Sequence, residues 1–295
     1  MIAYPLSDKL PHIISLTRLN SPIGIYLLLW PTLWALWFAA DGVPDLDNLI
    51  IFIFGTILTR SAGCAINDYA DRHLDGHVER TSTRPLATGD LTGNEALGVA
   101  GVLMLAAFIL VLFTNKQTIM MSFVALALAT VYPFSKRVTH WPQAFLGLAF
   151  AFAVPMAFAA QINTVPLIGW LIFLAAVIMA IAYDTLYAIA DREFDIKMGM
   201  KSTAILFGQK ELVIVFGLQL MALAILFNVG MLAGRGVTFN ISLVLSIGFV
   251  VYQNRISQQR DPTQCIKAFL NNHYLGMTIF FGTALDFIIK PSIAA

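Results

Sequence analysis

Charged residues are scarce in this chain of 295 residues, where Asp, Glu, Lys and Arg together make up only 12%. A soluble globular domain carries roughly 25% charged residues. Because 58% of the chain is hydrophobic, we predict an integral membrane protein embedded in the lipid bilayer. Neither sign of charge is in excess, since the net charge is +1, and this gives no electrostatic basis for binding nucleic acid.

Cysteine is scarce as well, and the two present, Cys64 and Cys265, match no metal or redox spacing. The five histidines show no ligand spacing with one another, so the sequence predicts no Cys and His set for zinc or iron. The first 22 residues lack a short apolar core followed by a small-residue cleavage site, and we therefore expect no signal peptide.

Long apolar runs, in contrast, recur from one end of the chain to the other. A membrane-spanning helix needs about 20 mostly apolar residues. No low-complexity or linker segment divides the chain, so we predict one all-α, polytopic domain over residues 1–295. The nine predicted spans lie at about 22–40, 48–66, 96–114, 118–134, 143–160, 166–188, 211–229, 237–254 and 273–289.

Basic residues are distributed unevenly between the two sides of these nine spans. The side that holds the N-terminus and every second loop carries fourteen Lys and Arg residues, and the opposite side carries three, Lys116, Arg235 and Lys290. Cytoplasmic loops of membrane proteins carry an excess of Lys and Arg. We therefore predict a cytoplasmic N-terminus and, with nine spans, a C-terminus outside.

Two acidic clusters follow directly on predicted spans of the cytoplasmic side, one over 67–75 and the other over 184–195. Charge in such a place is costly and is usually kept for function. Four helices separate the two clusters, which suggests a pseudo-repeat of four-helix units, about 22–134 and 143–254, followed by a ninth helix.

Side chains with oxygen atoms recur every four residues in both clusters, which places them on one face of a helix. Like charges at this spacing repel one another unless a cation joins them. A few oxygen ligands, completed by phosphate oxygens and water, suit Mg²⁺. The clusters thus predict a site for Mg²⁺ and a diphosphate, ahead of a surface acidic patch or a proton relay. The residues are Asn67, Asp71 and Asp75, then Asp191 and Asp195, with Asp184 two turns earlier.

Basic residues lie where the remaining charge of a diphosphate would need them. Guanidinium and ammonium groups are common phosphate partners. Each of them alone could equally be a topogenic or headgroup-facing charge, but together they favour a site. Arg18 with Asn20, just before the first span, forms a polar pair that could bind a small polar substrate. The phosphate candidates are Arg72 and Arg192 beside motif aspartates, Arg80 and Arg84 in the next loop, and Lys136 and Arg137 after Tyr132.

The pattern Asn67-x3-Asp71-x3-Asp75, the pair Asp191-x3-Asp195 and the nine spans together resemble the UbiA-type intramembrane prenyltransferases over nearly the whole chain. Finer stretches are similar to the branch of that family that prenylates 4-hydroxybenzoate in ubiquinone synthesis. They include Arg80-Thr-Ser-Thr-Arg84-Pro, Tyr132-Pro-Phe-Ser-Lys-Arg137 and Asp184-Thr-Leu-Tyr187-Ala-Ile-Ala-Asp191-Arg.

The resemblance implies a fold like that of soluble isoprenyl synthases, with a central cavity, in a bacterial inner membrane. It also implies Mg²⁺-dependent transfer of a polyprenyl group from polyprenyl diphosphate to the ring carbon ortho to the hydroxyl of 4-hydroxybenzoate.

The site residues follow from the same resemblance. Four aspartates, Asp71, Asp75, Asp191 and Asp195, would be catalytic and would hold Mg²⁺ together with Asn67. The acceptor carboxylate would bind Arg18, Arg72 or Arg137. The diphosphate and the substrates would also contact Asp68, Asp184, Arg72, Arg84, Tyr132, Lys136 and Arg137.

Two alternatives remain open at this point. Another branch of the same family would prenylate naphthoate, homogentisate, haem or a chlorophyll precursor. A cation-coupled secondary transporter would also use carboxylates, but transporters place their sites near mid-membrane in broken helices, whereas these clusters lie at one interface.

Overall fold

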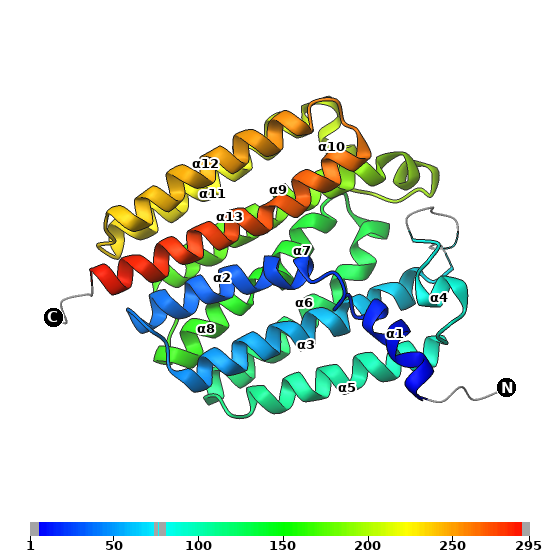
Figure 1. Cartoon of the computed structure of the whole chain (residues 1–295), viewed down its shortest axis with the longest axis horizontal. Coiled ribbons are helices and arrows are strands. Elements are labelled where there is room, and N and C mark those ends of the chain that lie inside the picture. Colours follow the sequence, from blue (N-terminus) through cyan, green and yellow to red (C-terminus); the bar gives the residue numbers. More distant parts are fainter. Residues whose placement is uncertain (1–5, 74–75, 77–80, 291–295) are drawn as a thin grey trace. The chain divides into compact units, whose positions relative to one another are not determined.

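The computed structural model describes residues 6–73, 76 and 81–290, and this part of the chain is helical without any strand (Figure 1). The predicted all-α fold is therefore confirmed. The helices are α1 (Leu6–Leu16), α2 (Ile23–Ala40), α3 (Leu46–Asp71), α4 (Pro85–Thr88), α5 (Gly93–Val111), α6 (Lys116–Val138), α7 (Pro142–Ala151), α8 (Ala153–Ile162), α9 (Leu167–Lys197), α10 (Thr203–Phe207), the short 3-10 turn η2 (Gly208–Lys210), α11 (Glu211–Leu232), α12 (Val237–Ile256) and α13 (Pro262–Ile289).

Eight segments of the described chain are long and apolar enough to cross a membrane, so the predicted count of nine is close but not confirmed. The predicted span 143–160 is built from two helices, α7 and α8, which meet at Phe152. The predicted span 273–289 lies within α13, which has 28 residues but is not among the eight. Its polar residues, among them Asn272, His273 and Asp286, lower its hydropathy.

The chain forms two compact units, each described here by itself. The first comprises residues 1–26 and 53–113, and the second comprises residues 27–52 and 114–295. The pseudo-repeat of four-helix units stays a prediction.

In the first unit, α5 begins in a capping box. The Thr92 hydroxyl accepts a hydrogen bond from the Glu95 backbone N–H, and the Glu95 carboxylate accepts one from the Thr92 N–H at 2.8 Å. Such a cap satisfies two N–H groups that the helix itself cannot pair. Lys9 of α1 forms an ion pair with the same Glu95. Beside it, Leu16, Ala65 and Leu91 belong to one small buried core, so α1 and α3 are packed onto the start of α5.

In the second unit, small residues let helices approach closely, as is usual between membrane helices. A Cβ added to Gly147 of α7 would lie 2.9 Å from the carbonyl oxygen of Val177 of α9. A Cβ at Gly282 of α13 would lie 2.2 Å from the Ser242 Cβ of α12, and these two helices run side by side (Figure 1).

Buried amides also connect the last three helices. The Nε2 group of Gln219 in α11 donates to Gln253 Oε1 in α12 at 2.6 Å and to Asn272 Oδ1 in α13 at 3.2 Å. All three side chains are buried. An unpaired amide would be costly in this apolar setting, so the network favours one packing of α11, α12 and α13.

Candidate active site

The first acidic cluster occupies the last turns of α3, which ends at Asp71. Asp71 is buried and Asn67, one turn earlier on the same face, is half-buried. Asp75, the third member of the predicted ligand set, lies outside the described residues, as does Arg80. The structure therefore places two of the three predicted oxygen ligands together at one helix end.

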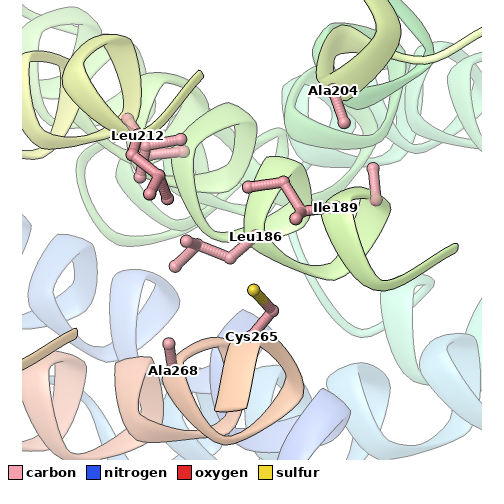
Figure 2. Close-up of a cluster of buried hydrophobic side chains, with 9 residues drawn as sticks. Leu186, Ile189, Ala204, Leu212, Cys265 and Ala268 are labelled. Atoms are coloured by element: carbon pink, nitrogen blue, oxygen red, sulfur yellow. The ribbon is translucent and has the colours of Figure 1, made fainter. Parts of the chain in front are cut away.

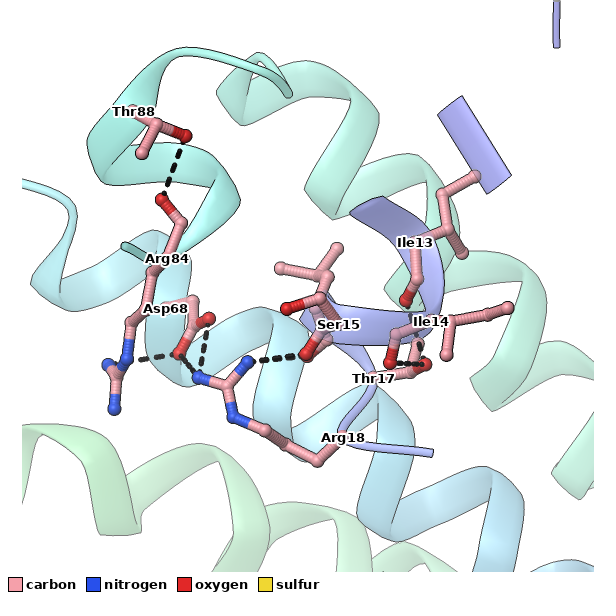
Figure 3. Close-up of polar contacts among 9 residues, drawn as sticks. Ile13, Ile14, Ser15, Thr17, Arg18, Asp68, Arg84 and Thr88 are labelled. Carbon is pink, nitrogen blue, oxygen red and sulfur yellow. Dashed lines mark hydrogen bonds and ion pairs between the residues drawn. The ribbon is translucent and has the colours of Figure 1, made fainter. Parts of the chain in front are cut away.

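Asp68, next to Asn67, binds two arginines (Figure 3). Arg18 Nη2 lies 2.8 Å from both carboxylate oxygens of Asp68, and Arg84 Nη1 lies 3.0 Å from Oδ1. The Asp68 side chain is only 2% exposed. Burying a carboxylate is costly, and the two guanidinium partners offset that cost. In this arrangement Asp68 serves as the counter-ion of the two arginines, and the substrate contact predicted for it stays a prediction.

Three arginines of the first unit, Arg18, Arg72 and Arg84, have intramolecular partners. Arg18 Nη1 donates to the Ser15 carbonyl at 2.6 Å, so the side chain joins the end of α1 to α3. Arg72 donates to the carbonyl of Tyr69 at 2.6 Å and stacks on that ring at 4.1 Å. Arg84 lies directly before α4, whose first residue is Pro85.

Arg60 is a further cation of α3, and the sequence interpretation set it aside. It lies within the membrane-spanning α3, seven residues before Asn67, which is two turns earlier on the same helix face. A Cβ at Gly24 would lie 2.8 Å from Arg60 Nη2, so the glycine leaves room for the guanidinium group. A charged residue inside a span indicates a functional site by default, and this is the signal that could have identified Arg60.

The second acidic cluster lies on the last turns of α9, a single helix of 31 residues. Asp184, Asp191 and Asp195 are all half-buried. Their spacing places them along about the same face, as predicted. Arg192 donates to the Ala204 carbonyl at 3.0 Å and lies 3.2 Å from Glu211 Oε1, and its predicted contact with phosphate stays a prediction.

The end of α6 carries Tyr132 and Lys136, both half-buried, and Arg137, which is exposed. The Lys136 carbonyl accepts from the Lys201 N–H at 2.9 Å, and Lys201 Nζ donates to the Val138 carbonyl at 2.9 Å. These bonds attach the end of α6 to the loop that follows α9. Within the second unit, the basic pair and the second acidic cluster are therefore brought to the same end of the helices.

A small apolar pocket lies deeper in the second unit, among α2, α7, α9 and α13. Tyr183, the residue before Asp184, lines this pocket, which places it next to the second acidic cluster in the chain. The wall is rich in aromatic rings, which present their negative faces to a cation. The main lining residues are Trp30, Trp34, Phe150, Tyr183, Asn272 and Gly276.

The model of the UbiA prenyltransferase family matches residues 28–281 of the chain. The chain belongs to the UbiA prenyltransferase family. Curated relatives named 4-hydroxybenzoate octaprenyltransferase agree with it over nearly their whole length. The protein of Hahella chejuensis is 53% identical over 98% of this chain and 97% of its own, and that of Nitrosospira multiformis is 50% identical over 97% and 99%.

Solved structures of UbiA homologues share the fold. The apo structure of a homologue from Aeropyrum pernix K1 superposes with a TM-score of 0.78 at 23% identity, covering 88% of this chain and 97% of its own. A homologue from Archaeoglobus fulgidus bound to GPP and Mg²⁺ has a TM-score of 0.70 at 20% identity, covering 93% and 99%. Together with the eight apolar spans, family membership makes this an integral membrane protein, and the transporter alternative is not supported.

The donor set of the UbiA site fits Mg²⁺. Asn67 and Asp71 at the end of α3 offer amide and carboxylate oxygens, and Asp191 and Asp195 near the end of α9 offer carboxylate oxygens; such oxygens are the ligands of hard divalent cations. Within the described residues, no three His, Cys, Asp or Glu side chains gather into a metal site by themselves.

Proposed function

We propose that this protein transfers a polyprenyl group from polyprenyl diphosphate to the ring carbon ortho to the hydroxyl of 4-hydroxybenzoate and releases diphosphate. The observation that carries the proposal is the 53% identity, over 98% of the chain, to a relative named 4-hydroxybenzoate octaprenyltransferase. The carboxylate-bearing ends of α3 and α9 supply the chemistry that this reaction needs.

Asn67, Asp71, Asp75, Asp191 and Asp195 would hold Mg²⁺ together with the diphosphate, with Asp184 in support. When bound, Mg²⁺ would neutralise negative charge on the leaving diphosphate. Arg84, Lys136 and Arg137 would bind the remaining phosphate oxygens, because guanidinium and ammonium groups form charge-assisted hydrogen bonds with them.

The reaction itself needs few proton transfers from the protein. The allylic C–O bond breaks and its electron pair leaves with the diphosphate. The electron-rich ring carbon ortho to the phenol oxygen forms the new C–C bond, and loss of the proton on that carbon restores the aromatic ring. The task of the chain is therefore to orient the two substrates and to keep water from the allylic cation.

The carboxylate of the acceptor needs a cationic partner, and Arg18, Arg72 and Arg137 were the candidates from the sequence. The first two have protein partners, Asp68 and the Tyr69 carbonyl, and the third is exposed. Arg60 is a fourth candidate, because it is a charged residue inside a membrane-spanning helix, on the face of α3 that carries Asn67.

Replacing these four arginines by alanine, one at a time, tests which of them binds the acceptor carboxylate. We expect Arg60→Ala to raise the KM for 4-hydroxybenzoate by roughly tenfold or more, the usual effect of losing one charged hydrogen bond, and to leave the KM for the prenyl donor unchanged. Arg60→Ala with an unchanged acceptor KM would return the role to Arg18, Arg72 or Arg137. If Ala at none of the four positions changed it, the assignment of an arginine would be wrong.

The orientation in the membrane is part of the proposal. The fourteen basic residues on one side favour a cytoplasmic N-terminus and active site, with the C-terminus outside, in a bacterial inner membrane. Single cysteines introduced at Glu193 and at Lys116, both in the described chain, would be labelled from opposite sides by an impermeant thiol reagent. Labelling of both from the same side would contradict the orientation.

Acceptor choice is tested by incubating purified protein with a polyprenyl diphosphate, Mg²⁺ and one acceptor at a time. Diphosphate release with 4-hydroxybenzoate but not with naphthoate or homogentisate is the expected result. Release with another acceptor alone would assign the chain to a different branch of the family.

A further inference from the structure

Glu211, the first residue of α11, is a fully buried carboxylate at the end of the helices that carries the second acidic cluster. Two arginines from different parts of the chain bind its Oε1 atom. Arg192 Nη2 of α9 lies 3.2 Å away, and Arg260 Nε, from the loop between α12 and α13, lies 2.6 Å away. Burying a carboxylate so deeply is costly unless charged partners such as these compensate it.

Arg192 is fixed by more than this ion pair. Its Nη2 also donates to the carbonyl of Ala204 at 3.0 Å, which ties α9 to α10. Arg192 directly follows Asp191 in α9, and Asp195 comes three residues later. Because the residues of one helical turn move together, holding the Arg192 side chain fixes the direction in which both aspartates point.

Residues close to Arg192 and Glu211 in the chain belong to a closely packed apolar cluster. Leu186 and Ile189 of α9 lie against Leu212 of α11 and Cys265 of α13 in one buried cluster (Figure 2). Just before Asp191, α9 therefore packs against apolar side chains, and just after it, at Arg192, α9 forms the ion pair with Glu211. An ionic contact next to a water-excluded cluster is screened less than one in solvent.

Arg260 holds a backbone conformation that residues other than Gly, Asn and Asp rarely adopt, with φ at 56°. Such strain persists where the surroundings over-determine it, and it concentrates at functional sites. Arg18 of the first unit shows the same combination, with φ at 58° and a side chain bound to the buried Asp68 beside Asn67. Each acidic helix end thus has a buried carboxylate with two arginines, one of them strained.

We propose that Glu211 is a positioning residue, which acts through Arg192 to orient Asp191 and Asp195 toward Mg²⁺ and the diphosphate. The inference rests on the proposed prenyl transfer, but Glu211 itself touches neither the metal ion nor a substrate. Residues that orient metal ligands from behind typically change metal affinity or activity by about 10- to 100-fold when replaced.

The test is a double-mutant cycle on the purified full-length protein, made of Glu211→Gln, Arg192→Gln and the pair. Each single variant should raise the half-saturating Mg²⁺ concentration and the KM for polyprenyl diphosphate by roughly tenfold or more, with the KM for 4-hydroxybenzoate unchanged. The double variant should be no worse than the poorer single variant, because both changes break the same contact. Effects that multiply would mean that Arg192 acts independently of Glu211 and would overturn the proposal.

Asp286→Asn is the matched control. Asp286 is equally buried in the same unit and accepts hydrogen bonds from the N–H groups of Gly236 at 2.8 Å and Phe239 at 3.2 Å, at the start of α12. This variant should lower the Tm while leaving both the Mg²⁺ dependence and the donor KM at wild-type values. If Glu211→Gln behaves in the same way as Asp286→Asn, Glu211 is structural only.

Two further measurements keep the outcomes distinct. If Glu211→Gln does not fold, Glu211→Asp, which keeps the charge and shortens the side chain, should shift the Mg²⁺ dependence in the same direction by a smaller factor, and an unchanged dependence would reject the role. If the wild-type protein releases no diphosphate, the prenyl-transfer proposal fails. The increase in Tm caused by Mg²⁺ with polyprenyl diphosphate, compared between wild type and Glu211→Gln, then still tests Glu211.

Discussion

The guanidinium group of Arg18 lies 2.8 Å from both oxygens of the Asp68 carboxylate, across fifty residues of sequence. This contact joins the loop after α1 to the last turns of α3, and Arg84 adds the start of α4. The acidic end of α3 is thereby held by segments on either side of it in the chain. Asp68 is adjacent to a proposed metal ligand, yet its oxygens face arginines.

Replacing Asp68 by Asn should therefore destabilise the protein without removing a metal ligand. The change leaves Arg18 and Arg84 without a buried counter-ion, and we expect a loss of about 1–3 kcal/mol in the free energy of unfolding, because both arginines are partly exposed. Thermal unfolding should show the loss, while the half-saturating Mg²⁺ concentration should rise far less than in a variant of a proposed metal ligand such as Asp71→Asn. A large increase in that concentration at unchanged Tm would mean that Asp68 binds the metal.

For replacements of the proposed metal ligands, in contrast to Asp68→Asn, we expect the main effect on activity. Asp71→Asn and Asp191→Asn should each reduce kcat/KM by roughly 100-fold or more, since each removes a charge that would hold Mg²⁺ against the diphosphate. Glu193→Gln is the control, because Glu193 lies between Asp191 and Asp195 but is exposed. Equal losses in Asp191→Asn and Glu193→Gln would show that only the overall charge of this helix end matters.

Close helix packing in the second unit gives a prediction on stability alone. Gly282→Ala places a Cβ 2.2 Å from the Ser242 Cβ, so α12 and α13 must separate, and we expect a loss of about 1–3 kcal/mol. Gly248 of α12 has nothing within 4 Å of such a Cβ. Gly248→Ala should therefore be neutral or stabilise the helix by up to about 1 kcal/mol. Equal effects of the two changes on Tm would contradict the packing.

Gly24 offers an indirect test of Arg60 that leaves the arginine in place. Gly24→Ala would bring a Cβ within 2.8 Å of Arg60 Nη2 and displace the guanidinium group. The KM for 4-hydroxybenzoate should rise several-fold, with little change for the prenyl donor. Gly63→Ala, in α3 with open space around its Cβ, should leave both KM values as they are. An unchanged acceptor KM in Gly24→Ala would speak against Arg60 as the acceptor site.

The positions of the acidic residues could be predicted from the sequence, because a spacing of four residues at the end of an apolar run already defines one face of a helix end. The ion-pair partner of Arg192 could not be predicted in this way. Its neighbour Asp191 indicated a phosphate contact, which stays a prediction, but gave no sign of the ion pair with Glu211, which lies 19 residues further along the chain. Local spacing does not tell which way a long side chain turns.

Helix breaks were similarly difficult to predict. The break between α7 and α8 follows from Pro155, whose ring would clash with the carbonyl of Ala151, where α7 ends. Pro31 and Pro133, however, lie inside α2 and α6 without ending them. The prolines mark positions in the sequence where a helix could end, but packing in the folded chain decides at which of them it does.

The most direct test of the proposed function is the product formed by the purified protein. With Mg²⁺, polyprenyl diphosphate and 4-hydroxybenzoate, mass spectrometry should find one prenyl group attached to carbon of the acceptor ring, with one diphosphate released per product. Chelating the metal should abolish both, and restoring Mg²⁺ should recover them. Diphosphate release without ring prenylation, or prenylation that continues in the absence of any divalent cation, would contradict the account.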